Sequence, residues 1–185
     1  MKRPFQISGK LLYQVFLHVT LVVLAIEVLL LTRQENGLEL QEKIKVGEGF
    51  TLSGIEMMNG HNMIDSTSQS IIFVFTTSCP FCMKSLPYWK LLASMAQSAG
   101  IEVLGVSIDS REKTTVLVRD SSLSFPVANA LDPQRFSRVN HLPSIPETIL
   151  RSKEGIALRI WSGPIEEKSL AEVVQAISDI NLKTN

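Results

Sequence analysis

The sequence has few cysteines and no excess of either charge. Its 185 residues include 2 cysteines, and 18 basic residues balance 18 acidic ones. Two cysteines can build neither a disulfide scaffold nor a four-ligand structural zinc site. A net charge of zero gives no electrostatic reason to expect nucleic acid as a partner. Hydrophobic residues make up 45% of the chain, which excludes a disordered protein and predicts one compact domain with a short appendage.

The appendage lies at the N-terminus, where charges are rare. Residues 11–31 contain one formal charge, that of Glu27. A helix of this length rises about 1.5 Å per residue and is about long enough to cross a bilayer core of ~30 Å. Residues 1–10 carry three basic residues and no acid, a bias that favours a cytoplasmic N-terminus. We therefore predict a single transmembrane anchor at residues 11–31, with the rest of the chain on the extracytoplasmic (periplasmic) side.

Two other interpretations of this segment are a cleaved signal peptide and a surface helix. Residues 31–34, which end the apolar run, lack the small side chains of a cleavage site. Gln14 and His18 lie one helical turn apart, but Glu27 falls on the opposite side of the helix, so that no continuous polar face supports a surface helix. These residues favour an uncleaved anchor.

The rest of the chain divides into a linker and a folded domain. Residues 32–45 are polar and charged and predict a linker, and residues 46–185 alternate between strand-like and helix-like patterns. Asn59-Gly60, between apolar residues, indicates a hairpin turn. We expect strands at residues 71–76, 101–108, 148–151 and 156–161, and helices at residues 80–99, 111–121, 133–139 and around 170–180. This order predicts an α/β fold in which helices cover a central mixed sheet.

Both cysteines lie where a buried strand gives way to a helix, in the sequence Cys79-Pro80-Phe81-Cys82. Cys79 would lie at the helix N-terminus, whose free amide groups favour a thiolate, the species that attacks disulfides. Cys82, one turn later on the same face, can resolve the mixed disulfide. A structural disulfide that closes so short a loop adds little stability, and His61 and His141 do not complete a zinc-finger spacing. We therefore predict a redox-active pair, with Cys79 as nucleophile and Cys82 as resolving cysteine, and expect no metal and no cofactor.

A proline at the start of a predicted strand is the second element of this site. Pro146 has no N–H to donate to a ladder, so that it belongs at a strand edge or start. If the Ile145–Pro146 bond is cis, the backbone of Ile145 is free to pair with an extended substrate segment beside Cys79. An ordinary trans loop proline is the alternative. We assign substrate binding to Ile145 and Pro146 and to the residues between the cysteines, Pro80 and Phe81.

Taken together, these motifs resemble a known family. From about residue 46 to residue 180 the chain is similar to the thioredoxin-like TlpA/ResA/CcmG (DsbE) group of membrane-anchored thiol–disulfide oxidoreductases, with the MauD-like proteins as close relatives. The resemblance rests on the opening hairpin around Asn59-Gly60, the active-site turn at residues 77–82, the helix proline Pro87 and the Pro-Glu-Thr strand at residues 146–150.

The resemblance implies a fold and a role. The fold would be thioredoxin-like, with an N-terminal β-hairpin extension and one preceding transmembrane helix. The protein would reduce the disulfides of client proteins, for example apocytochrome c in cytochrome c maturation or a client of a MauD-like maturation role. A membrane electron donor of the DsbD/CcdA type would return electrons to its cysteines.

The chain departs from this group at three positions. The tryptophan that usually precedes the first cysteine is Ser78. The buried acid of many thioredoxins would fall near Phe73, and the helix glutamate of ResA-like and CcmG-like proteins would fall at Ser85. The proton of Cys82 must therefore pass to water or to another group.

Two other functions compete with thiol–disulfide exchange. Residues 106–110 and 123–127 are similar to the AhpC/TSA peroxidases, and Thr76 stands three residues before Cys79 as in their peroxidatic motif. Against a peroxidase, Ile72 occupies the position of the motif's proline, and Pro146 that of the active-site arginine. The third hypothesis is a membrane-tethered assembly factor whose cysteines form a redox-dependent binding site without turnover.

Overall fold

The computed structural model describes residues 9–35, 43–58 and 67–184. The predicted hairpin turn at Asn59-Gly60 and His61 lie outside these residues. The chain divides into two compact units, Met1–Leu40 and Gln41–Asn185, which are described separately.

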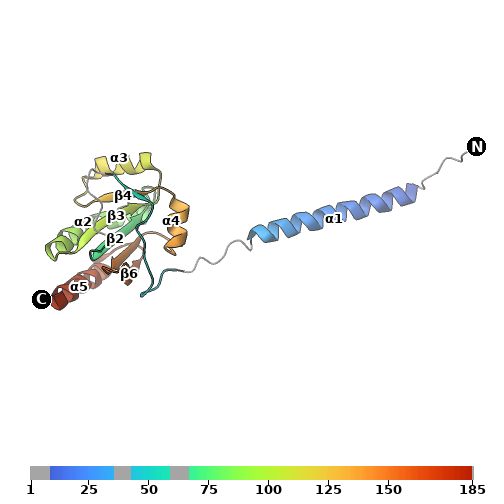
Figure 1. The fold of residues 1–185 in the computed structure, drawn as a ribbon. Coiled ribbons are helices and arrows are strands. Elements are labelled where there is room, and N and C mark those ends of the chain that lie inside the picture. Colours follow the sequence, from blue (N-terminus) through green and yellow to red (C-terminus); the bar gives the residue numbers. More distant parts are fainter. Residues whose placement is uncertain (1–8, 36–42, 59–66, 185) are drawn as a thin grey trace, which may run out of the picture. The chain divides into compact units, whose positions relative to one another are not determined.

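The first unit contains one long helix, α1 (Gly9–Glu35), which includes the predicted anchor (Figure 1). Its apolar side chains are spread around the whole circumference and do not gather on one face. The polar side chains His18 and Thr20 hydrogen bond to carbonyl groups of the preceding turn. Within the described part of the chain, no helix is both long enough and apolar enough to cross a membrane.

The second unit is built on a six-stranded mixed sheet with the strand order β1-β4-β3-β2-β5-β6. Its strands are β1 (Ile55–Met57), β2 (Ser70–Phe75), β3 (Glu102–Ser107), β4 (Val127–Ala130), β5 (Glu147–Arg151) and β6 (Ala157–Ser162). Strands β2, β3 and β4 run parallel, and β1, β5 and β6 are each antiparallel to their neighbours. The predicted mixed sheet is confirmed.

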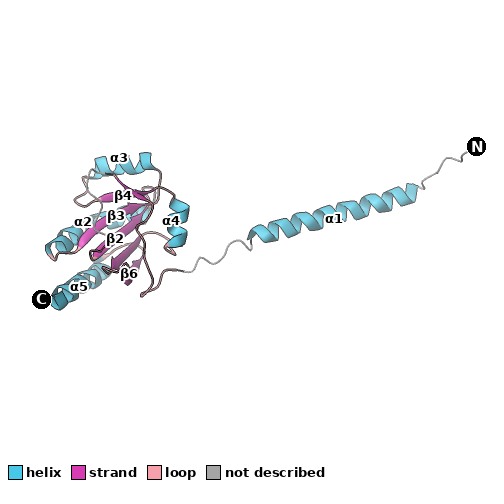
Figure 2. Cartoon of the chain, viewed as in Figure 1, coloured by secondary structure: helices cyan, strands magenta, loops and turns pink. Residues whose placement is uncertain are grey.

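Four helices cover the sheet, α2 (Pro80–Ser98), α3 (Arg111–Ser121), α4 (Pro133–Val139) and α5 (Glu167–Thr184). Trp89 of α2 and Val173 of α5 are fully buried in the core on one face of the sheet. Phe136 of α4 is buried in the core on the opposite face, together with Phe50. Figures 1 and 2 show α2 and α5 on the same side of the strands and α4 on the other.

The N-terminal ends of three helices follow from the local sequence. Cys79 is the N-cap of α2 and Pro80 its first residue, a position where a proline loses no hydrogen bond. Ser110 caps α3 by accepting from the N–H of Lys113, and Asp132 caps α4 in the same way. The predicted starts of these helices are confirmed. At each one a short side chain, with the sulfur of Cys79 or the oxygen of Ser110 or Asp132, accepts from an amide group that a helix leaves free.

Strand β4 was missed by the sequence reasoning. It contains four residues, Val-Ala-Asn-Ala, two of them alanines with little preference for strands. Its place is set by its neighbours, since it pairs in parallel with β3 and antiparallel with β1. All four of its residues are buried, so that tertiary packing outweighs the weak local signal.

The chain just before β1 belongs to the folded unit. The side chain of Ile44 is 3% exposed and packs in the core beside α4. Its N–H donates to the carbonyl of His141 at 2.8 Å, directly after α4 and before the strand-entry proline. Residues 43 and 44 therefore lie against the loop that leads into β5.

One edge of the sheet collects the elements that carry the chemistry. The three parallel strands end there, because Phe75 pairs with Ser107, which in turn pairs with Asn129. Antiparallel β5 begins at the same edge, with Glu147 opposite Val74. The turn to Cys79 and the loop that ends at Pro146 thus leave the sheet side by side.

Candidate active site

The two cysteines lie at the first turn of α2 and are both free thiols. Cys79 is the N-cap with an extended backbone, and its sulfur accepts the N–H of Cys82 at 3.2 Å. An amide that points at a sulfur from a helix N-terminus favours negative charge on that sulfur. Cys79 is partly exposed, whereas Cys82 is fully buried. The outer sulfur is therefore accessible to an external disulfide, and the inner one is not.

The buried Cys82 is held as a thiol. Burial, a hydrogen bond to the Cys79 sulfur and repulsion by negative charge there raise the pKa of Cys82 from 9.0 to about 12, although a backbone hydrogen bond with Thr76 opposes this. A thiol with such a pKa does not compete with Cys79 for an external disulfide near neutral pH. Cys82 is therefore suited to act second, from inside the protein.

The strand-entry proline lies where the sequence placed it. The Ile145–Pro146 peptide bond is cis, Pro146 is buried and Ile145 is partly buried. The carbonyl of Pro146 accepts from the N–H of Gly163 at 2.8 Å, which ties the proline to the end of β6. Within the described residues the backbone groups of Ile145 are not used in a hydrogen bond, so that they are available to an added strand.

The two positions at which the family resemblance would place an acid are filled differently. Phe73 is fully buried and its ring stacks on Trp89, with centroids 5.1 Å apart. The Ser85 hydroxyl donates to the carbonyl of Phe81 and accepts the N–H of Ile165, both at 2.9 Å. Ser85 is fully buried, so that it fastens the first turns of α2 to the segment before α5 and supplies no carboxylate to Cys82.

An aspartate braces the turn that leads to Cys79. Asp109, just after β3, accepts from the Thr77 hydroxyl at 2.7 Å and from the N–H of Ser110 at 2.8 Å. Lys113 lies 3.3 Å from the same carboxylate. Burial acts to raise the pKa of Asp109, but these hydrogen bonds and the lysine outweigh it and leave the pKa below its ordinary value. The sequence analysis did not predict the bond to Thr77.

We expect Thr77→Val to lower the stability of the fold by about 1–2 kcal/mol, because it leaves a partly buried carboxylate without one of its donors. Urea unfolding at pH 7 measures the change. Asp109 has a depressed pKa in the folded state, so that its contribution is present above its ordinary pKa and disappears as the pH falls through the folded value. The wild type and Thr77→Val should therefore converge in acid.

Thr115→Val is the matched control for this brace. The Thr115 hydroxyl also makes one hydrogen bond, to the Arg111 carbonyl on the exposed side of α3. Its loss should change stability by less than about 0.5 kcal/mol. Equal effects of the two substitutions at pH 7 would show that the Thr77–Asp109 bond has no special role.

A buried carboxylate beside Pro146 was also missed. Glu147 is fully buried and accepts from the hydroxyl groups of Ser144 and Ser162, at 3.3 and 2.7 Å. Lys43 lies 3.4 Å from it. A signal was present in the sequence, because an acid rarely lies at the start of a predicted buried strand without a partner.

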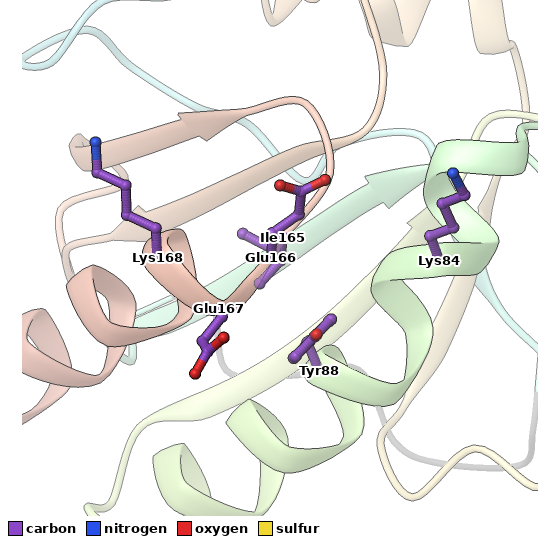
Figure 3. A pocket seen from close by; sticks show the side chains of 6 residues that line it. All are labelled: Lys84, Tyr88, Ile165, Glu166, Glu167 and Lys168. Atoms are coloured by element: carbon purple, nitrogen blue, oxygen red, sulfur yellow. The ribbon is translucent and has the colours of Figure 1, made fainter.

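A hollow of about 780 Å³ lies along α2, next to the exposed dipeptide between the cysteines. It is lined by Lys84, Tyr88, Ile165, Glu166, Glu167 and Lys168, and Figure 3 shows Lys84 and Tyr88 on α2 facing the segment that enters α5. The Lys84 ammonium lies 5.7 Å from the centroid of the Phe81 ring, which is 54% exposed. Lys84 therefore both lines the hollow and lies near the exposed ring of Phe81.

Comparison with known sequences gives one family match. The AhpC/TSA family matches residues 60–142, a stretch that contains both cysteines and ends before Pro146. No curated protein is similar enough in sequence to match this chain.

Comparison with solved structures gives similar folds at low sequence identity. A thiol-disulfide isomerase from Corynebacterium glutamicum has a TM-score of 0.59 and 18% identity, over 71% of this chain and 96% of that one. A candidate thiol:disulfide interchange protein DsbE from Chlorobium tepidum has a TM-score of 0.60 and 18% identity, over 73% and 99%. The thioredoxin domain of a thiol-disulfide oxidoreductase from Bacteroides vulgatus has a TM-score of 0.57 and 15% identity, over 72% and 98%. The second unit of this chain therefore has a thioredoxin-like fold.

Proposed function

We propose that this protein is a thiol–disulfide oxidoreductase that uses the Cys79-Pro80-Phe81-Cys82 pair, and that it acts as a membrane-anchored reductant outside the cytoplasm. The observation that carries the proposal is the asymmetry of the pair: Cys79 is accessible and its sulfur accepts an amide at the helix N-terminus, while Cys82 is buried as a thiol. The thioredoxin-like fold and the names of its structural neighbours support the same activity.

The exchange has two steps. The Cys79 thiolate attacks one sulfur of a client disulfide, which forms a Cys79–client bond and releases the other client sulfur as a thiolate. Cys82 then loses its proton and attacks the Cys79 sulfur, which closes the Cys79–Cys82 disulfide and releases the second client thiolate. Two electrons pass to the client, whose two sulfurs each take up a proton.

The client would lie along the edge that holds Cys79 and Pro146. Ile145 offers backbone groups at this edge that make no hydrogen bond in the part of the chain that the structure describes. Pro80 and Phe81 expose apolar surface beside Cys79. This arrangement suits an extended segment that adds as a strand and places its disulfide over Cys79. Apocytochrome c is the client class that the Pro-Glu-Thr strand favours. The resemblance to MauD-like proteins adds the client of a maturation role of that kind, and a DsbD/CcdA-type membrane donor would be the electron source.

The direction of electron flow has a direct test. Equilibration of the purified protein with glutathione buffers should give a reduction potential on the reducing side of DsbA-type oxidants, for which the value is about −120 mV. Pro80 and Phe81 place no charge between the cysteines, so that they add nothing to stabilise the reduced form further. A potential as high as that of DsbA would assign the protein to oxidation of clients.

The membrane location is supported by the sequence of α1. The apolar run extends from residue 11 to residue 31, and the structure describes only part of its side chains. Apolar residues lie all around the helix, as expected for a transmembrane helix and not for a surface helix. Hydrogen bonds from His18 and Thr20 to the helix backbone reduce the cost of placing these groups in lipid.

We expect the full chain to stay in the membrane pellet after an alkaline carbonate wash. Val22→Arg combined with Leu24→Arg should release the protein from the membrane, because each arginine costs about 2.5–3.5 kcal/mol at the centre of a transmembrane helix. The control is Val22→Leu with Leu24→Val, which keeps the composition and should keep the protein in the pellet.

Alkaline phosphatase fused at the C-terminus should be active, and an inactive fusion would place the redox domain in the cytoplasm.

A peroxidase is the second candidate, because the AhpC/TSA family matches residues 60–142. Ile72 is fully buried in the middle of β2 and cannot shape a peroxide site, and Pro146 offers no positive charge to polarise a peroxide bond. Hydrogen peroxide should therefore be consumed no faster than by an ordinary thiol. Saturable turnover of peroxide by the wild type would favour this candidate.

A further inference from the structure

We propose that Lys43 is a positioning residue for client binding. It acts through the buried carboxylate of Glu147, which in turn holds the loop that leads to Pro146. This inference rests on the proposed thiol–disulfide exchange and adds to it a residue from the segment predicted to be a linker. Lys43 does not touch the reacting sulfurs. It acts on the position of the loop that pairs with the client.

The Glu147 carboxylate joins three pieces of chain. Its Oε1 accepts from Ser144 at 3.3 Å and lies 3.4 Å from the Lys43 ammonium. Its Oε2 accepts from Ser162, at the end of β6, at 2.7 Å. Ser144 directly precedes Ile145, whose backbone groups make no hydrogen bond within the described residues and are those offered to a client. The position of this carboxylate therefore sets the position of the loop.

Lys43 is the one cation paired with this carboxylate in the described part of the chain. The Glu147 side chain is fully buried, whereas that of Lys43 is 45% exposed. A buried carboxylate that loses its cation is strongly disfavoured and turns towards water or other donors. Because Ser144 shares Oε1 with Lys43, such a turn would move the hydroxyl of Ser144 and the backbone that follows it.

The position of Lys43 is itself fixed. The next residue, Ile44, is buried in the core and its N–H donates to the His141 carbonyl at 2.8 Å. The backbone that carries Lys43 is thus held at the start of the same loop, and the ammonium reaches Glu147 from an anchored base. A lysine on a free linker would give no such constraint, since ordering it would cost most of what the pair contributes.

The experiment uses the full chain in detergent with two substrates, insulin and a small aromatic disulfide that reacts at Cys79 without lying along the loop. We expect Lys43→Met to raise KM for insulin about 10-fold with little change in kcat, the size of effect given by a close charged pair. Reduction of the small disulfide and alkylation of Cys79 should stay within about twofold of wild type. Lys43→Arg keeps the charge and should restore KM.

Two further variants separate positioning from general loss of charge. Lys43→Met combined with Glu147→Gln should be no worse than Glu147→Gln alone, because the lysine acts only through the carboxylate. Lys153→Met removes an exposed lysine from the β5–β6 turn and should leave KM unchanged.

A wild-type KM in Lys43→Met, or independent effects of Lys43→Met and Glu147→Gln, would overturn this inference while leaving the proposed function intact. A wild-type protein that reduces neither substrate would overturn both.

Discussion

Cys82→Ser is expected to accumulate a stable mixed disulfide with its client, whereas Cys79→Ser should form none. In Cys82→Ser the exposed sulfur can still attack, but nothing inside the protein can release the product. In Cys79→Ser the remaining sulfur is fully buried, and burial is the largest cause of its raised pKa, so that both access and ionisation oppose attack. Turnover of a disulfide substrate should fall by more than about 100-fold in both variants, since each removes a sulfur that takes part directly.

The trapped species also separates the three functions. Non-reducing electrophoresis of cells that express Cys82→Ser should show adducts that dithiothreitol removes, and mass spectrometry should place the bond at Cys79. A binding module without turnover would instead retain its partners when both cysteines are serine. A peroxidase would show a sulfenic acid at Cys79 after peroxide and no adduct before it. Adducts linked through Cys82 would contradict the assignment of roles.

The parts of the fold that the sequence predicted depend on neighbours along the chain. The starts of α2, α3 and α4 are marked by Pro80, Ser110 and Asp132. Pro80 has no N–H to leave unpaired, and the other two accept from amides within the first turn of their own helix. Strand β2 (Ser70–Phe75) was predicted, as residues 71–76, because a short continuous apolar run needs no partner to be recognised as buried. β4 has no comparable local mark and exists because β3 and β1 pair with it.

The same distinction holds for the site. The cysteine pair and Pro146 are recognisable because their chemistry lies in the residues themselves and in their spacing. The bond between Thr77 and Asp109 joins residues 32 apart in sequence, and the pair of Lys43 with Glu147 spans most of the domain. Nothing in a single sequence says which acid meets which donor across such distances, so that these contacts needed the structure.

The stability of the dithiol form should fall as the pH rises above about 9, because of Cys82. The folded state raises the pKa of this thiol from 9.0 to about 12, so that the unfolded chain gives up a proton in a range where the folded chain keeps it. The stabilisation is complete below pH 9 and is lost as the pH rises towards the folded pKa, at up to about 1.4 kcal/mol per pH unit. Urea unfolding between pH 8 and pH 11, under reducing conditions, measures the slope.

Two variants isolate the contribution of Cys82 from that of other groups that titrate in this range. Cys82→Ser has no thiol at this position, and the difference between its stability and that of the wild type should shrink as the pH rises. In Cys79→Ala the hydrogen bond and the negative charge are gone but burial, the largest cause of the shift, remains; the slope should persist over a narrower range. Parallel curves of stability against pH for the wild type and Cys82→Ser would mean that Cys82 ionises as freely in the folded protein as in the unfolded chain. Cys82 could then no longer be assigned the role of a protonated resolving cysteine.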